Sequence, residues 1–131
     1  MLIKWVSCTT TDPAAFATAQ AGWNALRDLP GFLGQAGGWS QHEPGRAQII
    51  GCWHDQAAYR AFMSGAHDRI AAGQAGTYDT IQVRIFPARQ DIGRPFSPGF
   101  AEAILEQLTG DQIRLDSAWT VLPQRSAIRP G

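Results

Sequence analysis

The side chains that could do chemistry gather in residues 47–70, where an apolar strand leads into an amphipathic helix. Tyr59, Phe62, Met63 and His67 recur there at helical spacing, so they share one face. An imidazole on an otherwise apolar face could act as a general base near neutral pH. His67 could instead be a core histidine satisfied by one hydrogen bond. We interpret His67 as the candidate catalytic residue and keep the structural alternative open.

Aromatic side chains could form the wall of a ligand site. Five tryptophans are many for 131 residues, and most are expected in the core or at an interface, since each buries a large area. Packing is also the simpler explanation for Trp53. The candidates for contact with a substrate are Trp39, Trp53, Tyr59, Phe62, Met63 and Arg84. An inward-facing Arg84 could orient an anionic substrate, whereas an outward-facing one would join a dimer contact.

Metal and cofactor signatures are not evident in the sequence. His42, His54 and His67 show no metal-binding spacing such as i, i+4 on a helix. Cys8 and Cys52 lack a CxxC spacing and are expected to be reduced, buried, small apolar residues. The glycine-rich segment matches neither GxxxxGK[ST] nor GxGxxG, so it is not a phosphate loop. We therefore expect no metal and no cofactor.

The charge balance narrows the class of partner. Eleven basic and eleven acidic residues cancel, which gives no electrostatic argument for a nucleic-acid partner. No basic helix suggests a membrane surface. The first apolar stretch, residues 1–6, is interrupted by Lys4 and is too short for a signal peptide or a spanning helix. The expected compartment is the cytoplasm.

The order of elements predicts a fold for residues 1–86. Strands are expected over residues 2–9, 32–41, 47–54 and 80–86, and helices over residues 12–26 and 56–72, the second with Gly65 as a weak point. This β-α-β-β-α-β order is typical of an α+β, ferredoxin-like antiparallel sheet with both helices on one face. The other face would carry apolar side chains, and a second copy of the chain is its simplest cover.

Residues 87–131 form a predicted C-terminal extension. A polar, proline-containing linker at 87–98 precedes a short helix that begins at Ser97–Pro98 and ends at Gly110. Residues 112–122 read as a strand with Trp119 on its apolar side. Such a strand should dock on a free sheet edge because its backbone groups need partners. We expect it to cross to a partner subunit, the alternative being that it folds back on its own.

Four sequence strings carry a resemblance to a known superfamily. LIKW, GFLGQAGGW, W-x5-Y-x2-FM-x3-HD and Y-x2-I-x-V-x-IF, all within residues 1–86, resemble the dimeric α/β-barrel proteins, which include the antibiotic-biosynthesis and haem-degrading monooxygenases. More closely, they resemble an uncharacterised bacterial family within that superfamily. The resemblance implies a homodimer and a cleft in each subunit between helices and sheet.

The haem-degrading branch uses an Asn on its first strand, a Trp in its second helix and a His about three turns later. The matching positions here hold Ser7 or Cys8, Phe62 and a residue near Ala72, so all three depart from that pattern. Three functions stay open. The chain is a cofactor-independent monooxygenase-like enzyme acting on a small aromatic or polyketide-like compound, a non-catalytic or stress-related dimer that binds a small apolar or aromatic ligand, or a structural domain whose cleft is filled by its own side chains.

Overall fold

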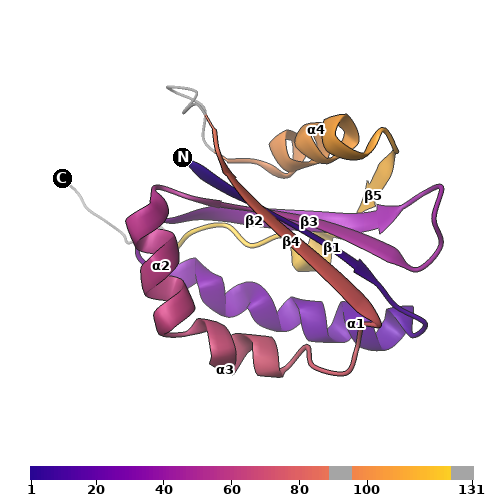
Figure 1. Cartoon of the computed structure of the whole chain (residues 1–131), viewed down its shortest axis with the longest axis horizontal. Helices are drawn as coiled ribbons and strands as arrows, with labels where there is room; N and C mark the ends of the chain where they lie inside the picture. Colours follow the sequence, from indigo (N-terminus) through magenta and orange to yellow (C-terminus); the bar gives the residue numbers. More distant parts are fainter. Residues whose placement is uncertain (89–95, 125–131) are drawn as a thin grey trace.

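Five antiparallel strands form one sheet in the order β4-β1-β3-β2-β5 in the computed structural model, which describes residues 1–88 and 96–124 (Figure 1). The strands are β1 (Leu2–Thr9), β2 (Phe32–Ser40), β3 (Arg46–Trp53), β4 (Thr80–Pro87) and β5 (Ile113–Leu115). The helices are α1 (Pro13–Gln20), α2 (Gln56–Ser64), α3 (His67–Ala72) and α4 (Pro98–Thr109), with two 3-10 helices, η1 (Ala21–Asp28) and η2 (Ser117–Trp119). The first four strands confirm the predicted ferredoxin-like α+β order.

Side-chain caps fix where the helices begin. Asp12, Asp55 and Ser97 each accept a hydrogen bond from the backbone N–H three residues later, at 3.1, 2.9 and 3.1 Å. Gly110 ends α4 with a positive φ of 70°, a conformation that glycine adopts without strain. The starts predicted at Asp12 and Ser97 and the end predicted at Gly110 are therefore confirmed.

The single helix expected over residues 56–72 is wrong, because the chain breaks at Gly65. This residue has φ −117° and ψ −93°, outside the helical region, and glycine is a poor helix former. The break separates α2 from α3, and His67 opens the second piece. His67 nevertheless stays on the side that faces the sheet, where it contacts the Phe62 ring at 5.3 Å between centroids.

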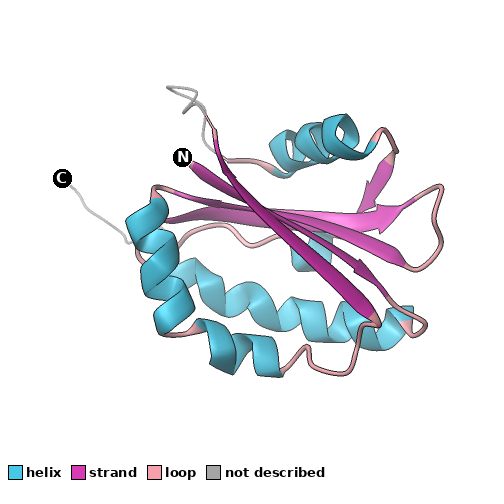
Figure 2. Ribbon diagram, in the orientation of Figure 1, coloured by secondary structure: helices cyan, strands magenta, loops and turns pink. Residues whose placement is uncertain are grey.

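The alternation of β1 divides its side chains between two layers. On one side of the sheet lie α1, η1, α2 and α3, and α4 lies on the other (Figure 2). Lys4, Val6 and Cys8 face the first layer, while Ile3 packs in the cluster beneath α4. Both cysteines are free and buried, as expected.

The second sheet face is covered in part by the chain itself. Ala101 and Leu105 of α4 are fully buried against Ile3, Ile50 and Cys52 of the central strands. The expectation that a second copy covers this face is therefore corrected over β2 and β3. The apolar side of α4 fills that role because the extension is long enough to return over the sheet.

The extension folds back on its own chain. Its strand, β5, pairs with the chain's own β2, with Gly38 opposite Leu115 and Ser40 opposite Ile113. The strand expected over residues 112–122 is also shorter than predicted, since Asp116 accepts a hydrogen bond from the Ala118 N–H and turns the chain into η2. Pairing resumes only at a single bridge between residues 35 and 121.

After α4 on one face, the chain passes the β2 edge and reaches the other face, where Trp119 is fully buried. The register of β2 shifts between Phe32 and Gly34, an irregularity typical of a glycine-rich strand. Residues 89–95 of the predicted linker lie outside the described residues.

In the described part of the chain, no helix has both the length and the apolar character needed to cross a bilayer.

Candidate functional site

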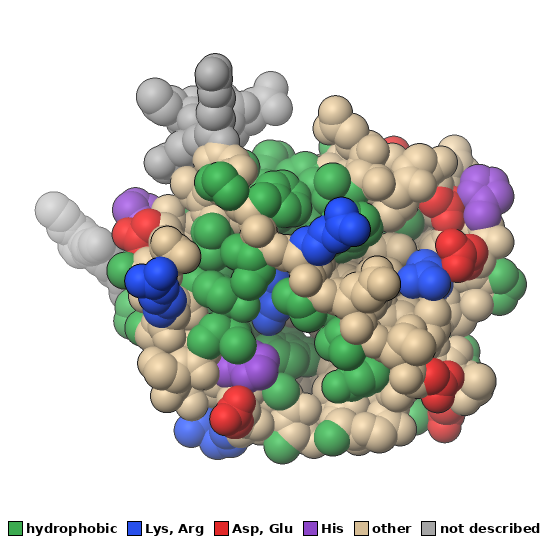
Figure 3. Space-filling model, viewed as in Figure 1, with side chains coloured by type: hydrophobic (Ala, Val, Ile, Leu, Met, Phe, Trp, Pro, Cys, Tyr) green, Lys and Arg blue, Asp and Glu red, His purple; other side chains and the backbone are tan. Residues whose placement is uncertain are grey.

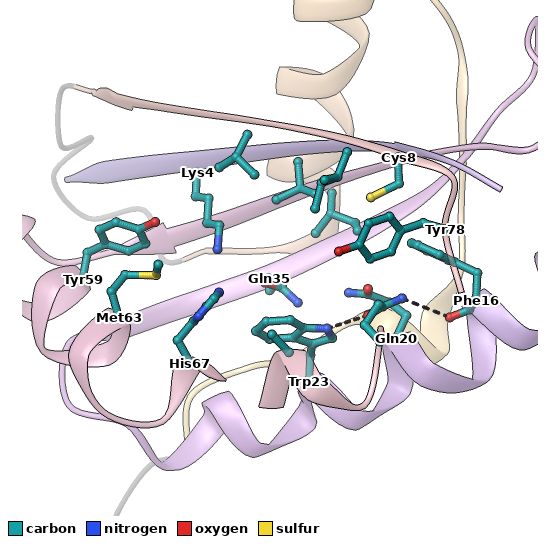
Figure 4. A pocket seen from close by; sticks show the side chains of 16 residues that line it. Lys4, Cys8, Phe16, Gln20, Trp23, Gln35, Tyr59, Met63, His67 and Tyr78 are labelled. Atoms are coloured by element: carbon teal, nitrogen blue, oxygen red, sulfur yellow. Dashed lines mark hydrogen bonds between the residues drawn. The ribbon is translucent and has the colours of Figure 1, made fainter. Parts of the chain in front are cut away.

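A cavity of about 360 Å³ lies between the sheet and the layer of α1, η1, α2 and α3. Its walls combine aliphatic side chains of β1, β3 and β4 with aromatic and polar side chains of the helices (Figure 4). The face shown in Figure 3 is hollowed at this place, with hydrophobic side chains around the opening. Two β4 residues of the lining, Ile81 and Val83, are 46% and 47% exposed, so the cavity opens beside β4.

Three of the predicted site residues reach this cavity. Tyr59 and Met63 project from α2 and His67 from the start of α3 (Figure 4). The His67 ring is 23% exposed, and its Nδ1 lies 3.0 Å from Oδ1 of Asp68, whose side chain is 95% exposed. This pairing holds the ring while its other nitrogen stays available, which is the geometry of a usable acid or base.

Trp53 and Phe62 support the site from behind. Their rings stack at 4.9 Å between centroids, and the two residues are only 2% and 4% exposed. Trp23 of η1 packs edge-on against Phe62, at 6.3 Å between ring centroids, and itself lines the cavity. Trp53 and Phe62, which were predicted to contact a substrate, do not line this cavity. They border a second, smaller hollow of about 250 Å³ beside α2.

Trp39 and Arg84 lie away from the cavity. Trp39 packs against Phe16 and Trp119, at 5.7 and 5.2 Å between ring centroids. Arg84 sits on the opposite side of the sheet, with its guanidinium 5.6 Å from the Trp5 ring centroid. The outward orientation considered for Arg84 is therefore the one the structure adopts, because strand alternation sends its neighbour Val83 toward the cavity.

Lys4 is a cavity residue that sequence reasoning missed. Its side chain descends from β1, and its ammonium lies 5.6 Å from the ring centroids of Tyr59 and Phe62 and 5.9 Å from that of Trp23 (Figure 4). Burial lowers its pKa to about 8. The available signal was a lone lysine in an apolar strand on the same parity as Val6 and Cys8.

Side-chain amides supply most of the other polar groups. Gln74 is 6% exposed; its Oε1 accepts a hydrogen bond from Trp23 Nε1 at 2.7 Å, and its Nε2 donates to the Phe16 carbonyl at 3.4 Å. These bonds fix the indole as a rigid wall. Gln20 and Gln35 are 3% and 8% exposed and also line the cavity.

Two titratable groups of the lining are held neutral. Burial raises the pKa of the Cys8 thiol to about 11, although the Arg46 charge acts in the other direction. Burial also raises the pKa of Tyr59. A neutral thiol is a poor nucleophile, so Cys8 serves as lining. Within residues 1–88 and 96–124, no group of three or more His, Cys, Asp or Glu side chains could hold a metal ion.

An apolar hollow of this size with a few convergent polar groups is typical of a small-molecule site. Its lining combines an imidazole, an ammonium, neutral amides and two phenols. The arrangement can hold a planar apolar body, donate hydrogen bonds to an oxygen and exchange a proton. The cleft is open, which argues against a domain whose side chains fill it.

Comparison with known proteins places the chain in a family. An uncharacterised protein of Bacillus subtilis (strain 168), YdbC, is 34% identical over 126 residues, which cover 93% of this chain and 98% of that protein. The solved structure of SnoaB, a cofactor-independent oxygenase from Streptomyces nogalater, is similar with a TM-score of 0.56 at 21% identity, covering 71% of this chain and 98% of SnoaB.

The haem degrader MhuD from Mycobacterium tuberculosis, solved with two haems in its active site, has a TM-score of 0.55 at 18% identity, covering 71% of this chain and all of MhuD. At such identities these structures share the fold with this chain. Residues 2–86 match the model of a family described as a domain of unknown function, DUF4937. The chain therefore belongs to the DUF4937 family and has the ferredoxin-like fold of the antibiotic-biosynthesis-monooxygenase-like proteins.

Proposed function

We propose that the cavity binds a small aromatic or polyketide-like compound and that the chain acts on it as a cofactor-independent monooxygenase-like enzyme. The observation that carries this proposal is the cavity of about 360 Å³, with apolar and aromatic walls and His67 at its lining. The presence of a cofactor-independent oxygenase among proteins of the same fold supports it.

The chemistry requires little from the protein besides binding and proton transfer. His67 takes a proton from an activated CH₂ of the substrate, and the resulting carbanion supplies the electrons to dioxygen. The CH₂ becomes a carbonyl with one oxygen atom of O₂, and the second oxygen atom leaves as water. An apolar wall suits this reaction because it keeps bulk water from the carbanion.

A non-catalytic receptor is the second candidate, and the open side of the cavity favours it. Asp68, the partner of His67, is 95% exposed, and the cavity opens beside β4, so solvent reaches this end of the site. Reversible binding of a ligand needs such an opening, whereas oxygenation of a carbanion needs it closed.

A homodimer is part of the proposal. Ile81, Val83 and Ile85 form a row of apolar side chains, 43–47% exposed, on the strand at one edge of the sheet. A second copy seated on this row would cover the apolar side chains and close the cavity. Light scattering at micromolar concentration tests it: we expect a dimer that Val83→Lys dissociates, and a monomeric native protein would contradict the assembly.

The test of function uses 1,8-dihydroxyanthrone, whose activated CH₂ lies between two aromatic rings. We expect oxygen uptake above the autoxidation rate, with one quinone formed per O₂ consumed. His67→Gln should reduce uptake to background. His54→Gln is the matched control, because His54 also pairs with the following aspartate, at 3.2 Å, but lies outside the cavity.

Binding is measured separately with a pair of α3 variants. Ala71 lines the cavity and Ala72 is exposed, so Ala71→Phe should block binding and Ala72→Phe should leave it unchanged. Binding without oxygen uptake would support the receptor function. Binding that persists in Ala71→Phe would place the ligand elsewhere and overturn both functions.

A further inference from the structure

The lone lysine of the chain has an unusual environment for a cation. Lys4 is the one lysine among 131 residues, and its side chain ends inside the cavity (Figure 4). No Asp or Glu carboxylate in the described part of the chain lies within ion-pair distance of its ammonium. Ammonium groups withdrawn from water are normally paired, because an isolated charge is costly there.

Aromatic rings compensate for this charge only in part. Trp23, Tyr59 and Phe62 place their rings 5.6–5.9 Å from the ammonium, within the range of a cation–π contact. Such contacts are weaker than a hydrogen-bonded ion pair and leave the three N–H groups without an acceptor. The ammonium thus lies among ring faces that do not neutralise it.

The cavity as a whole carries one sign of charge. Of its sixteen lining residues none is Asp or Glu, so no lining carboxylate opposes Lys4. His67, the other basic residue of the lining, is paired with Asp68 at 3.0 Å. Lys4 enters from the sheet and His67 from the helical layer opposite, so both reach the same space (Figure 4). Low-dielectric walls around uncompensated positive charge concentrate the potential on a bound anion.

Amide and phenol groups are placed to hold the rest of such an anion. The side-chain amide of Gln35, which is 8% exposed, points into the cavity (Figure 4). Tyr59 adds a hydroxyl whose pKa is raised by burial, so it stays a neutral donor. A ligand oxygen near Lys4 would therefore have neutral donors beside the ammonium.

We propose that Lys4 is the counter-ion of the ligand, and that the compound this cavity takes is an aromatic or conjugated acid whose anionic oxygen, as carboxylate, phenolate or enolate, pairs with the Lys4 ammonium. This inference rests on the proposed function, since it names the chemical class that the same cavity selects. The planar body lies between Trp23 of the helical layer and Val6 and Ile49 of the sheet. An acid of this kind completes the ion pair that the chain leaves unmade.

The test compares 2-naphthoate with 2-naphthamide, which share a ring system and differ in charge, by calorimetric titration at pH 7. The native protein should bind the naphthoate at least about ten-fold more tightly than the amide, as expected for a charge-assisted hydrogen bond. Lys4→Met should lose this preference and keep its affinity for the amide. Methionine has a similar shape and removes an unpaired charge, so the variant is expected to fold.

Arg84→Met is the matched control. Its guanidinium also lies over an aromatic ring, but on the opposite side of the sheet. This variant should bind both probes as the native protein does.

The outcomes separate the two proposals. If both probes bind the native protein and Lys4→Met equally, Lys4 is not the counter-ion, and the inference fails while the cavity stands as an aromatic-ligand site. If neither probe binds the native protein, the cavity does not take aromatic ligands and the proposed function fails as well. If Lys4→Met loses the amide along with the naphthoate, the side chain shapes the site without selecting charge, which also overturns the inference.

Discussion

Replacing Lys4 with methionine is expected to stabilise the ligand-free protein at pH 7 and to change how its stability depends on pH. Burial lowers the pKa of Lys4 from 10.5 to about 8, so the folded chain holds this proton less tightly than the unfolded chain does. The difference corresponds to an upper bound of about 3 kcal/mol. Cation–π contacts offset part of it, by about 0.5–2 kcal/mol. We expect a gain of about 1–2 kcal/mol in Lys4→Met at pH 7.

The sign of the pH dependence follows from proton binding. Between pH 8 and 10.5 the unfolded chain keeps the Lys4 proton and the folded chain releases it, so the free energy of unfolding rises with pH in this window. From pH 7 to 9.5 the native protein should gain about 2 kcal/mol relative to Lys4→Met. Cys8 and Cys52, whose pKa values burial raises to about 11 and about 12, act in the opposite direction. Both proteins contain these thiols, so the comparison cancels them.

Urea unfolding under reducing conditions at several pH values from 7 to 9.5 measures the effect. Arg84→Met is the control, because an arginine does not titrate in this range and its difference from the native protein should stay flat. A Lys4→Met difference that is constant within about 0.5 kcal/mol across the range would show that the ammonium is hydrated in the folded chain. Burial in the cavity would then not weaken proton binding by Lys4.

Three further predictions concern stability. Phe62→Ala should lower the free energy of unfolding by about 3–5 kcal/mol in urea titrations, because the ring is 4% exposed and stacked; a loss below about 1 kcal/mol would mean that the site collapses without cost. Gly34→Ala should lower Tm, because a Cβ there would lie 2.1 Å from the Phe96 ring and the residue has a φ of +152°. Gly22→Ala is the control, since a Cβ at Gly22 would meet open space. Equal melting of the two variants would contradict the close approach of Gly34 to Phe96. A chain that ends at Phe86 should melt below the full chain in calorimetry because the cluster beneath α4 becomes exposed, and an unchanged Tm would refute the role of the extension.

Local signals in the sequence were sufficient for most of the fold. Capping residues such as Asp12 and Ser97, and the alternation of Ile81, Val83 and Ile85, depend on chemistry within a few positions. The break at Gly65 was visible only as a weak point, because propensity does not decide whether tertiary contacts hold a helix straight.

Local sequence signals could not predict which sheet edge the C-terminal strand pairs with. The strand predicted over residues 112–122 could pair with either free edge of either subunit, and nothing in its own residues distinguishes these edges. Its early end depends on Asp116, whose side chain competes for the backbone N–H of Ala118.

The candidate site also combines residues that local spacing predicts with one that only the tertiary structure brings in. Helical spacing brought Tyr59, Met63 and His67 together, and the structure places all three around the cavity. Phe62 shares their face but sits deeper, since it is covered by Trp53. Lys4 was not predicted as a site residue, because it lies on β1, far in sequence from α2. It meets the rings of α2 only in the assembled fold.

The path of the extension around the β2 edge, with α4 on one face and Trp119 on the other, has a consequence for how the chain folds. The apolar surface over β2 and β3 is buried by residues of the same molecule, so its burial is a unimolecular event. This part of the core therefore contributes the same free energy of unfolding at any protein concentration, and a concentration dependence of the thermal midpoint would report the contact between copies alone. A contact with a second copy would add stability to a core that a single chain already completes.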